Sequence, residues 1–89
     1  MSQDAEIVET TLRSVLTDVL GIPPARVATF DSLTPLFGSL PELDSMAVAG
    51  LLTEIEDRLG IVVEDDEVDG EMMETFGSLL HFIRTKALL

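Results

Sequence analysis

The stretch Asp44-Ser-Met-Ala-Val-Ala-Gly-Leu-Leu-Thr-Glu-Ile-Glu-Asp-Arg-Leu-Gly60 predicts one amphipathic helix. At about 3.6 residues per turn, its apolar side chains share one face and its small and polar side chains share the other. Asp44 and Ser45 both suit the N-cap position, because a short side-chain oxygen accepts hydrogen bonds from free N–H groups of the first turn. Gly60 suits the end, because glycine adopts a left-handed conformation without steric cost. The face expected to be buried consists of Val48, Leu51, Leu52, Ile55 and Leu59.

The opposite face of this helix carries Met46, a large apolar side chain next to Ser45. Packing in the core does not account for a methionine at this position, so we expect a partner protein to dock there. A single exposed methionine is common on protein surfaces and is weak evidence by itself. The other residues on this face are Gly50, Thr53 and Asp57.

The length and composition bound the class of protein. The chain of 89 residues suffices for one small core, so we expect a single domain spanning residues 1–89. No apolar stretch approaches the roughly 20 residues that a membrane-spanning helix needs. The N-terminus lacks the pattern of a secretory signal, and the chain has no cysteine. We therefore expect a cytoplasmic monomer without a membrane span.

The chain is strongly acidic, with 17 acidic and five basic residues and a net charge of −12. Such a charge repels phosphate backbones and anionic lipids, so we expect no nucleic-acid partner. From Glu42 to Glu74 there are twelve carboxylates and one basic residue, Arg58. This segment is either a solvated surface that keeps the protein dissolved, or a surface that steers the chain toward basic patches on partner proteins.

Two further helices are predicted on either side of the central one. Apolar residues recur at helical spacing from about Gln3 to Leu20, and the two prolines that follow Gly21 end that helix. The last helix is expected to begin at Thr75, a suitable N-cap residue, and to carry basic residues in its final turns. The expected buried stripes are Val8, Leu12, Val15, Leu16 and Val19 in the first helix, and Phe76, Leu79, Leu80, Phe82, Ile83 and Ala87 in the last.

The connection Gly21–Leu43 contains four prolines and is long for an unstructured loop in a compact domain. Its apolar residues recur every three or four positions, so we expect an ordered loop packed onto the helices. Asp31 to Leu33 is expected to open a short helical turn. The apolar residues of the loop are Val27, Phe30, Leu33, Leu36, Phe37, Leu40 and Leu43.

The segment after Gly60 begins with three β-branched residues, Ile61–Val63, followed by an acidic run. One strand without a partner cannot pair, so we expect an extended linker that places Ile61 or Val63 in the core. Val68, within the acidic run, indicates a short third helix. The fold expected from these elements is all-α, a small four-helix bundle with a long ordered loop between its first two helices.

The acidic run resembles a calcium-binding loop only in part. Asp65, Glu67, Asp69 and Gly70 align with the first, third, fifth and sixth positions of such a loop. The twelfth position, which requires a bidentate glutamate, would be Phe76. We therefore predict no metal site.

Ser45 has no evident partner for nucleophilic catalysis. An activated serine needs an adjacent base held by a third group, and the only histidine is His81 in the last helix, where an ordinary surface residue is the simpler interpretation. We predict no catalytic residue and no enzymatic activity. A hydroxyl at a helix N-terminus is well placed to receive a phosphate group, because N–H groups and the helix dipole stabilise an anion there. The alternative is that Ser45 only caps the helix.

Asp44-Ser45-Met46, followed by a helix that ends Glu54-Ile-Glu-Asp-Arg-Leu-Gly-Ile61, resembles the acyl carrier protein family. The resemblance extends over the whole chain. It implies a bundle of acyl carrier type in which Ser45, preceded by Asp44, receives a covalent 4′-phosphopantetheine arm from coenzyme A. A separate holo-acyl-carrier-protein synthase, a phosphopantetheinyl transferase, would attach the arm with the help of magnesium. The thiol of the arm would then carry acyl groups as thioesters.

The resemblance also implies the partners and the surface they use. Enzymes that load and transfer acyl groups would bind the exposed side of the second main helix through basic patches. In this chain that surface corresponds to Met46, Glu56 and Asp57. The apolar stripes would leave a gap between helices for the acyl chain.

Two departures from the family pattern bear on the pathway. Family members of fatty-acid biosynthesis usually carry acidic residues two and five positions after the serine, where this chain has Ala47 and Gly50. The run Ser39-Leu-Pro-Glu-Leu-Asp-Ser-Met46 is similar to carrier proteins associated with exosortase and exopolysaccharide systems. We therefore rank a dedicated lipid or exopolysaccharide-linked pathway above bulk fatty-acid synthesis. The alternatives are a peptidyl carrier protein, which tends to be less acidic, and a non-covalent acidic interaction module.

Overall fold

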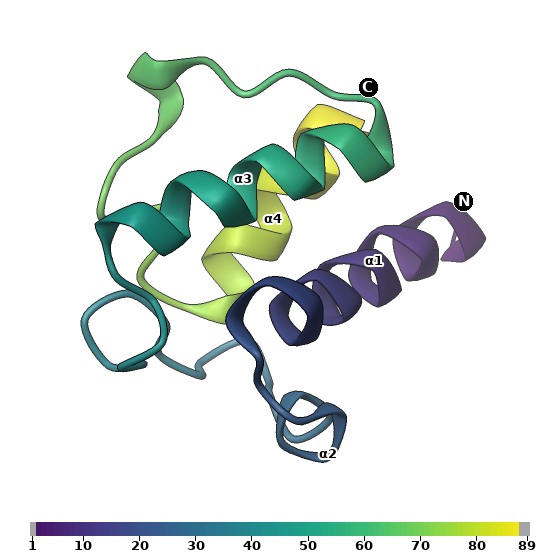
Figure 1. The fold of residues 1–89 in the computed structure, drawn as a ribbon. Coiled ribbons are helices and arrows are strands. Elements are labelled where there is room, and N and C mark those ends of the chain that lie inside the picture. Colours follow the sequence, from purple (N-terminus) through teal and green to yellow (C-terminus); the bar gives the residue numbers. More distant parts are fainter. Residues whose placement is uncertain (1, 88–89) are drawn as a thin grey trace.

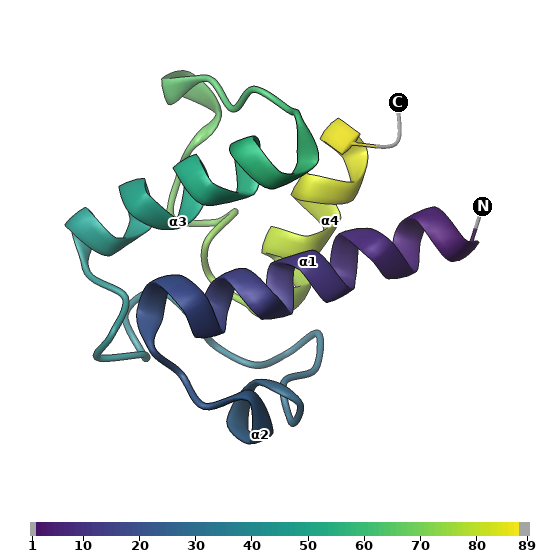
Figure 2. The same ribbon diagram turned by 45° about the vertical axis from the view of Figure 1, so that its right-hand side comes forward.

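A computed structural model describes residues 2–87 of the chain, with side chains from residue 5 onward. Three long helices pack around one core, and the connection after α3 runs back alongside α3 before it turns to α4 (Figures 1 and 2). The predicted all-α bundle is confirmed, and within the described residues the only β pairing is an isolated bridge between Pro35 and Thr75. The elements are α1 (Ser2–Leu20), α2 (Pro24–Val27), α3 (Ser45–Leu59), the 3-10 helix η1 (Asp65–Glu67) and α4 (Phe76–Ala87).

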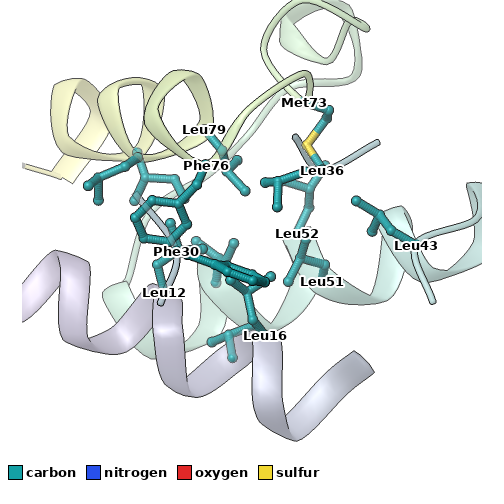
Figure 3. Packing of buried hydrophobic residues seen from close by; sticks show 14 of the residues in the cluster. Leu12, Leu16, Phe30, Leu36, Leu43, Leu51, Leu52, Met73, Phe76 and Leu79 are labelled. Atoms are coloured by element: carbon teal, nitrogen blue, oxygen red, sulfur yellow. The ribbon is translucent and has the colours of Figure 1, made fainter. Parts of the chain in front are cut away.

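The predicted stripes of the three long helices form the core shown in Figure 3. In each helix most stripe residues are buried, and the remaining ones are half-buried against the same cluster. The buried stripe residues are Val8, Leu12, Val15 and Leu16 in α1, Leu51, Leu52 and Ile55 in α3, and Phe76, Leu79, Leu80 and Ile83 in α4. The half-buried ones are Val19, Val48, Leu59, Phe82 and Ala87. The helical periodicity therefore identified the core correctly.

The connection from residue 21 to residue 43 is ordered, as expected, but its helix lies elsewhere. The short helix α2 begins at Pro24, where a proline fits because its missing N–H would have no partner in a first turn. The predicted helical turn at Asp31–Leu33 is wrong. The Asp31 carboxylate accepts a hydrogen bond from the Leu33 N–H at 2.9 Å, and the Asp31 carbonyl accepts one from Thr34, so this segment is a tight polar turn.

Two apolar residues of this loop are exposed, against expectation. Leu33 is 81% exposed because it lies in the polar turn, and Phe37 is 43% exposed. The other five predicted residues of the loop are buried, and so is Ile22, which was not predicted. The buried residues are Ile22, Val27, Phe30, Leu36, Leu40 and Leu43.

Arg13, a residue of α1, binds the loop formed by residues 21–43 and also contacts Phe76 of α4. Its guanidinium donates hydrogen bonds to the carbonyl oxygens of Val27 at 2.7 Å and Phe30 at 3.1 Å. The same group lies over the Phe76 ring, 4.6 Å from the ring centroid, where a cation is attracted by the ring's negative face. The Phe30 and Phe76 rings meet edge to face with centroids 6.2 Å apart. One arginine therefore satisfies two loop carbonyls and packs against the aromatic pair.

Residues 32–37, defined here as the clamp segment, are fastened to the start of α4 by four backbone hydrogen bonds. Phe76 and Gly77, in the first turn of α4, donate to the carbonyls of Thr34 and Ser32 at 2.8 and 3.0 Å. The N–H groups of a first helical turn have no partner within the helix, so the clamp segment satisfies two of them. In return, the Leu36 and Phe37 N–H groups donate to Glu74 and Met73.

The connection from α3 to α4 contains the expected linker and short helix. Ile61 packs against the core, Val63 is half-buried, and Val62 is 66% exposed. The predicted short helix near Val68 is the 3-10 helix η1, which ends at Glu67 and has Val68 as its C-cap. Thr75 caps α4 as predicted, because its hydroxyl accepts a hydrogen bond from the Ser78 N–H at 3.0 Å.

No helix within residues 2–87 combines the length and the apolar character that a membrane crossing requires. The cytoplasmic location expected from the sequence stays a prediction.

Gly77 lies where the clamp segment meets α4, which leads to a stability prediction. A Cβ at this position would lie 2.5 Å from the Ser32 carbonyl oxygen, so the clamp segment would have to shift. We expect Gly77→Ala to lower the free energy of unfolding by about 1–3 kcal/mol, measured by urea denaturation.

The matched control is Gly50→Ala, in the middle of α3. A Cβ there would meet only Val19 Cγ1, at an ordinary 3.8 Å, so removal of a helical glycine should raise stability by about 0.5–1 kcal/mol. Equal effects of the two substitutions would contradict a tight contact at Ser32.

The ion pair between Glu67 and Lys86 predicts a pH-dependent contribution to stability. The Lys86 ammonium lies 2.7 Å from the Glu67 carboxylate and, together with the Glu64 backbone N–H, lowers the pKa of Glu67 below its ordinary value of 4.5. A carboxyl whose pKa is lowered by folding stabilises the protein above its unfolded pKa, and this stabilisation is lost as pH falls through the folded pKa. We therefore expect Glu67→Gln to be less stable than the wild type at neutral pH, and the difference to vanish in acid.

Urea unfolding of both proteins across this pH range is the measurement. Glu71→Gln is the control, because Glu71 is an exposed carboxylate of the same connection. A Glu67→Gln difference that persists unchanged well below the ordinary carboxyl pKa would contradict the ion-pair origin.

Candidate functional site

The start of α3 leaves the Ser45 hydroxyl free. Asp44, in an extended conformation with φ −98° and ψ −177°, is the N-cap, and its Oδ1 accepts a hydrogen bond from the Ala47 N–H at 2.8 Å. The Asp44 carbonyl accepts from the Val48 N–H at 2.9 Å. Ser45 is exposed as the first residue of the helix, and its hydroxyl makes no hydrogen bond within residues 2–87. Asp44 therefore caps the helix, and the Ser45 hydroxyl remains available to other groups.

Two backbone N–H groups at this helix end also lack partners. Among the described residues, neither the Ser45 nor the Met46 N–H donates a hydrogen bond, since the bonds of the first turn begin at Ala47. Unpaired N–H groups at the positive end of a helix form a site for a phosphate-type anion. The exposed hydroxyl and the two donors together can hold a phosphodiester at Ser45.

The structure places no general base with Ser45. The single histidine, His81, is exposed on α4, where it lines a hollow whose other residues come from η1, the segment that follows it, and α4. Ser45 is not part of that hollow. The residues lining it are Glu67, Asp69, Glu71, Met72, Ser78, His81, Phe82 and Thr85.

The predicted partner-binding residues differ in their exposure and in whether their side chains already make a hydrogen bond within the fold. Met46 is 85% exposed on the outer face of α3, and Asp57 is exposed near its end. Glu56 is half-buried, and its Oε2 accepts a hydrogen bond from the Val63 N–H at 2.8 Å. Glu56 therefore also holds the linker that follows α3, a role that the sequence pattern did not indicate.

A hollow of about 240 Å³, called the α3 pocket from here on, opens one helical turn from Ser45. Val48 is three positions after Ser45 in α3 and therefore lies on the same side of the helix. Phe37 of the clamp segment forms another wall. Sequence periodicity gave no sign of this role, because it placed Phe37 in the core. The lining residues are Phe37, Val48, Val68, Asp69, Gly70 and Met73.

All five basic residues of the chain are ion-paired. One of these, Arg26, holds the carboxylate of Glu42, three positions before Ser45, at 3.0 Å. A hydrogen bond from the Glu42 backbone N–H, and then the Arg26 guanidinium, lower the pKa of Glu42 below its ordinary value. From residue 5 onward the acidic side chains outnumber these five basic ones, so the described surface is negative overall.

The described residues contain no group of three or more histidine and acidic side chains arranged to hold a metal ion. Two members of the partial calcium-loop alignment have other partners. The Glu67 carboxylate pairs with Lys86, and Asp69 Oδ1 accepts a hydrogen bond from the Met72 N–H at 2.7 Å.

Comparison with known proteins defines the class of protein to which this chain belongs. Residues 10–83 match the family model described as a phosphopantetheine attachment site. The fold is also similar to the solution structure of a holo acyl carrier protein from Nitrosomonas europaea, with a TM-score of 0.77 and 38% sequence identity over 88% of this chain and 92% of that one. These two matches define a carrier domain of the phosphopantetheine-binding class.

The chain belongs to the acyl carrier protein family, as the sequence resemblance indicated. The cofactor of this family is a covalently bound 4′-phosphopantetheine, and the domain is a carrier rather than a catalyst. Such carriers work with a phosphopantetheinyl transferase and with acyl-handling enzymes. When bound, the group supplies a thiol that holds acyl groups as thioesters.

Proposed function

We propose that Ser45 is the attachment residue and that this protein presents acyl thioesters to partner enzymes. The observation that carries the proposal is the division of roles at the start of α3. The Asp44 carboxylate is used in the cap, whereas the Ser45 hydroxyl and the N–H groups of Ser45 and Met46 are free. Attachment would form a bond between Ser45 Oγ and the pantetheine-side phosphorus of the coenzyme A diphosphate, break the bond from that phosphorus to the bridging oxygen, and release adenosine 3′,5′-bisphosphate and the hydroxyl proton.

The same helix end would stabilise the attached group. A phosphodiester at Ser45 would carry a negative charge at the positive end of a 15-residue helix, within reach of two unpaired N–H donors. The Asp44 carboxylate is also negative, but its Oδ1 is already bound to the Ala47 N–H. The helix start therefore tolerates the new charge.

The partner surface in this proposal consists of Met46 and the acidic side of α3. Met46 lies directly beside Ser45, so an enzyme that reaches the hydroxyl would cover it. Asp57 is free to attract a basic patch, whereas Glu56 shares its carboxylate with the Val63 N–H. Of the two acidic residues, Asp57 is the more available to partners.

The pathway we propose is a dedicated one rather than bulk fatty-acid synthesis. Ala47 and Gly50 replace the acidic residues that partners in fatty-acid synthesis usually meet, and Gly50 is exposed. The first turns of the outer face of α3 therefore lack recognition charges. A peptidyl carrier is the second candidate, and the charge of −12 argues against it.

The attachment prediction is tested by intact mass. Incubation with coenzyme A, magnesium and a promiscuous phosphopantetheinyl transferase should raise the mass by one phosphopantetheine group, and Ser45→Ala should prevent the increase. Ser39→Ala is the matched control, because Ser39 is an exposed serine of the preceding loop and its loss should leave the modification intact. An unchanged wild-type mass would reject the carrier assignment of Ser45.

A second prediction concerns Met46. Because its side chain is 85% exposed, Met46→Ser should leave the melting temperature almost unchanged. If a partner covers the methionine, the same substitution should slow modification of Ser45 roughly tenfold, which corresponds to about 1.4 kcal/mol of lost contact in the complex. The initial rate of the mass increase at limiting transferase is the measurement.

The control for Met46→Ser is Val62→Ser. Val62 is another exposed apolar residue, 66% exposed, just beyond the opposite end of the 15-residue helix α3. At about 1.5 Å per residue it lies roughly 20 Å from Ser45 and should not affect the rate. Equal modification rates for the Met46→Ser and Val62→Ser variants would show that Met46 is not part of the docking surface.

A further inference from the structure

We propose that Arg26 is a positioning residue for the modification of Ser45, and that it acts by holding Glu42 in the segment that leads into α3. This inference rests on the proposed function of Ser45, because it concerns how the hydroxyl is presented to the transferase. Residues 39–44 are called the lead-in segment from here on. The inference follows from the few contacts that hold this segment and from those that hold Arg26.

The backbone of the lead-in segment has little support from the rest of the fold. Its backbone hydrogen bonds within the described residues all join positions at most four apart, and Pro41 has no N–H to donate. Ser39 and Leu40 donate to the Leu36 carbonyl at 3.0 and 2.9 Å, and Leu43 donates to Leu40 at 3.0 Å. The preceding clamp segment is instead bonded to the start of α4. The course of the lead-in segment therefore depends on its side chains.

One directional contact ties a side chain of this segment to a distant part of the chain. Leu40 and Leu43 are buried in the core, but apolar contacts have no preferred direction. The Glu42 Oε2 atom accepts a hydrogen bond from Arg26 Nη1 at 3.0 Å. Within the described residues, this is the only side-chain hydrogen bond between residues 39–43 and any other segment. A hydrogen-bonded ion pair has a preferred geometry, so it fixes the segment where the buried leucines alone would let it turn.

Arg26 is itself anchored to the core of the bundle. It belongs to the short helix α2, where its neighbour Val27 is 2% exposed. The Val27 carbonyl accepts a hydrogen bond from Arg13 of α1 at 2.7 Å. The Arg26 carbonyl accepts a hydrogen bond from the Thr29 hydroxyl at 2.6 Å, which holds the end of α2. The ion pair therefore connects the lead-in segment, through α2, to the 19-residue helix α1.

The geometry at Ser45 depends on the course of this segment. Glu42 lies three positions before Ser45, and Asp44 between them must stay extended for its carboxylate to reach the Ala47 N–H at 2.8 Å. Without the ion pair, the lead-in segment would populate several courses, of which the transferase binds one. The apparent affinity of an enzyme for such a substrate falls with the populated fraction of the competent conformation. Loss of the pair should therefore raise the KM of the transferase for this protein and leave kcat unchanged.

The test is the steady-state kinetics of phosphopantetheine transfer to the full chain, followed by intact mass at increasing concentrations of this protein. Arg26→Gln should raise KM roughly threefold at unchanged kcat, an effect in keeping with a partly exposed ion pair. Arg26→Lys should keep KM close to the wild-type value, because the contact uses a single N–H group that an ammonium also supplies. Retention in Arg26→Lys would show that the paired charge, rather than the shape of the guanidinium, positions the segment.

Arg84→Gln is the matched control. Arg84 lies in the last turn of α4 and binds Glu9 of α1 at the same 3.0 Å, and its side chain is 36% exposed against 44% for Arg26. Both substitutions make the chain more acidic by one charge, which by itself would speed the encounter with a basic enzyme. Arg84→Gln should therefore not raise KM, whereas Arg26→Gln should.

Two further measurements separate positioning from direct contact between Glu42 and the transferase. If the ion pair acts as a unit, Glu42→Ala should raise KM about as much as Arg26→Gln, and the double variant should show no larger effect. In hydrogen exchange without enzyme, Arg26→Gln should speed exchange of the Leu43 N–H, which donates within the lead-in segment. The Phe37 N–H, which donates to Met73 from the clamp segment, should exchange at its wild-type rate.

Four results would overturn the inference. The first two are a wild-type KM for Arg26→Gln and a lowered kcat in place of a raised KM. The others are an equal rise in KM for Arg84→Gln, and a rise for Glu42→Ala without one for Arg26→Gln, which would indicate direct contact with the enzyme. Each leaves the attachment at Ser45 intact, since the wild type has gained its mass. A wild type that gains no mass would refute the proposed function, and the exchange rate of the Leu43 N–H would still show whether Arg26 holds the segment.

Discussion

The contact between the clamp segment and the first turn of α4 connects the fold to the site. Its backbone hydrogen bonds satisfy N–H groups that α4 cannot pair internally, and they fix Leu36 and Phe37 against Met73 and Glu74. The α3 pocket is bounded by Phe37 on one side of this contact and by Met73 on the other. A shift at Gly77, where an added Cβ would meet the Ser32 backbone, would therefore change the pocket as well as the stability of the bundle.

The start of α3 shows how two adjacent residues of similar capping ability take different roles. Either Asp44 or Ser45 could cap a helix, and a serine in the cap would have used its oxygen on the backbone. The carboxylate of Asp44 accepts from Ala47, so the helix begins one residue earlier than a Ser45 cap would require. The Ser45 hydroxyl then lies on the first turn of the helix, outside the cap and exposed to solvent. This placement is what a covalent attachment point needs, because the transferase has to approach the oxygen.

The sequence predicted the parts of the fold that depend on local spacing. The stripes of α1, α3 and α4, the Thr75 cap and the glycine that ends α3 all follow from periodicity and capping chemistry within one element, whereas the cap of α3 was left open between Asp44 and Ser45. The position of Ser45 on the surface follows from the same rules. Each of these features is decided by neighbours three or four residues apart.

The features that the sequence did not predict depend on contacts between distant segments. Leu33 and Phe37 share the spacing of the buried loop residues, but the Asp31 turn and the backbone bonds to Met73 direct them outward. The second role of Glu56 depends on where the chain turns after Gly60. Pro24 did carry a local signal for α2, since proline favours the first position of a helix, but the preceding glycine and prolines suggested only a break.

The distribution of charge explains how an acidic protein can have few charged side chains on the helical turns that follow Ser45, its proposed attachment residue. Every basic side chain is held by a carboxylate within the fold, so the basic residues brace the helices and the unpaired acidic residues are left over. At Ser45, apart from the capping Asp44, the nearby positions on α3 are Met46, Ala47 and Gly50, none of which is charged. In the proposed function, long-range attraction to a basic partner would come from the rest of the surface, and contact at the hydroxyl would be made by apolar and backbone atoms. Since charge mainly sets the rate of encounter and buried apolar contact sets how long a complex lasts, the two tasks are assigned to different parts of the same molecule.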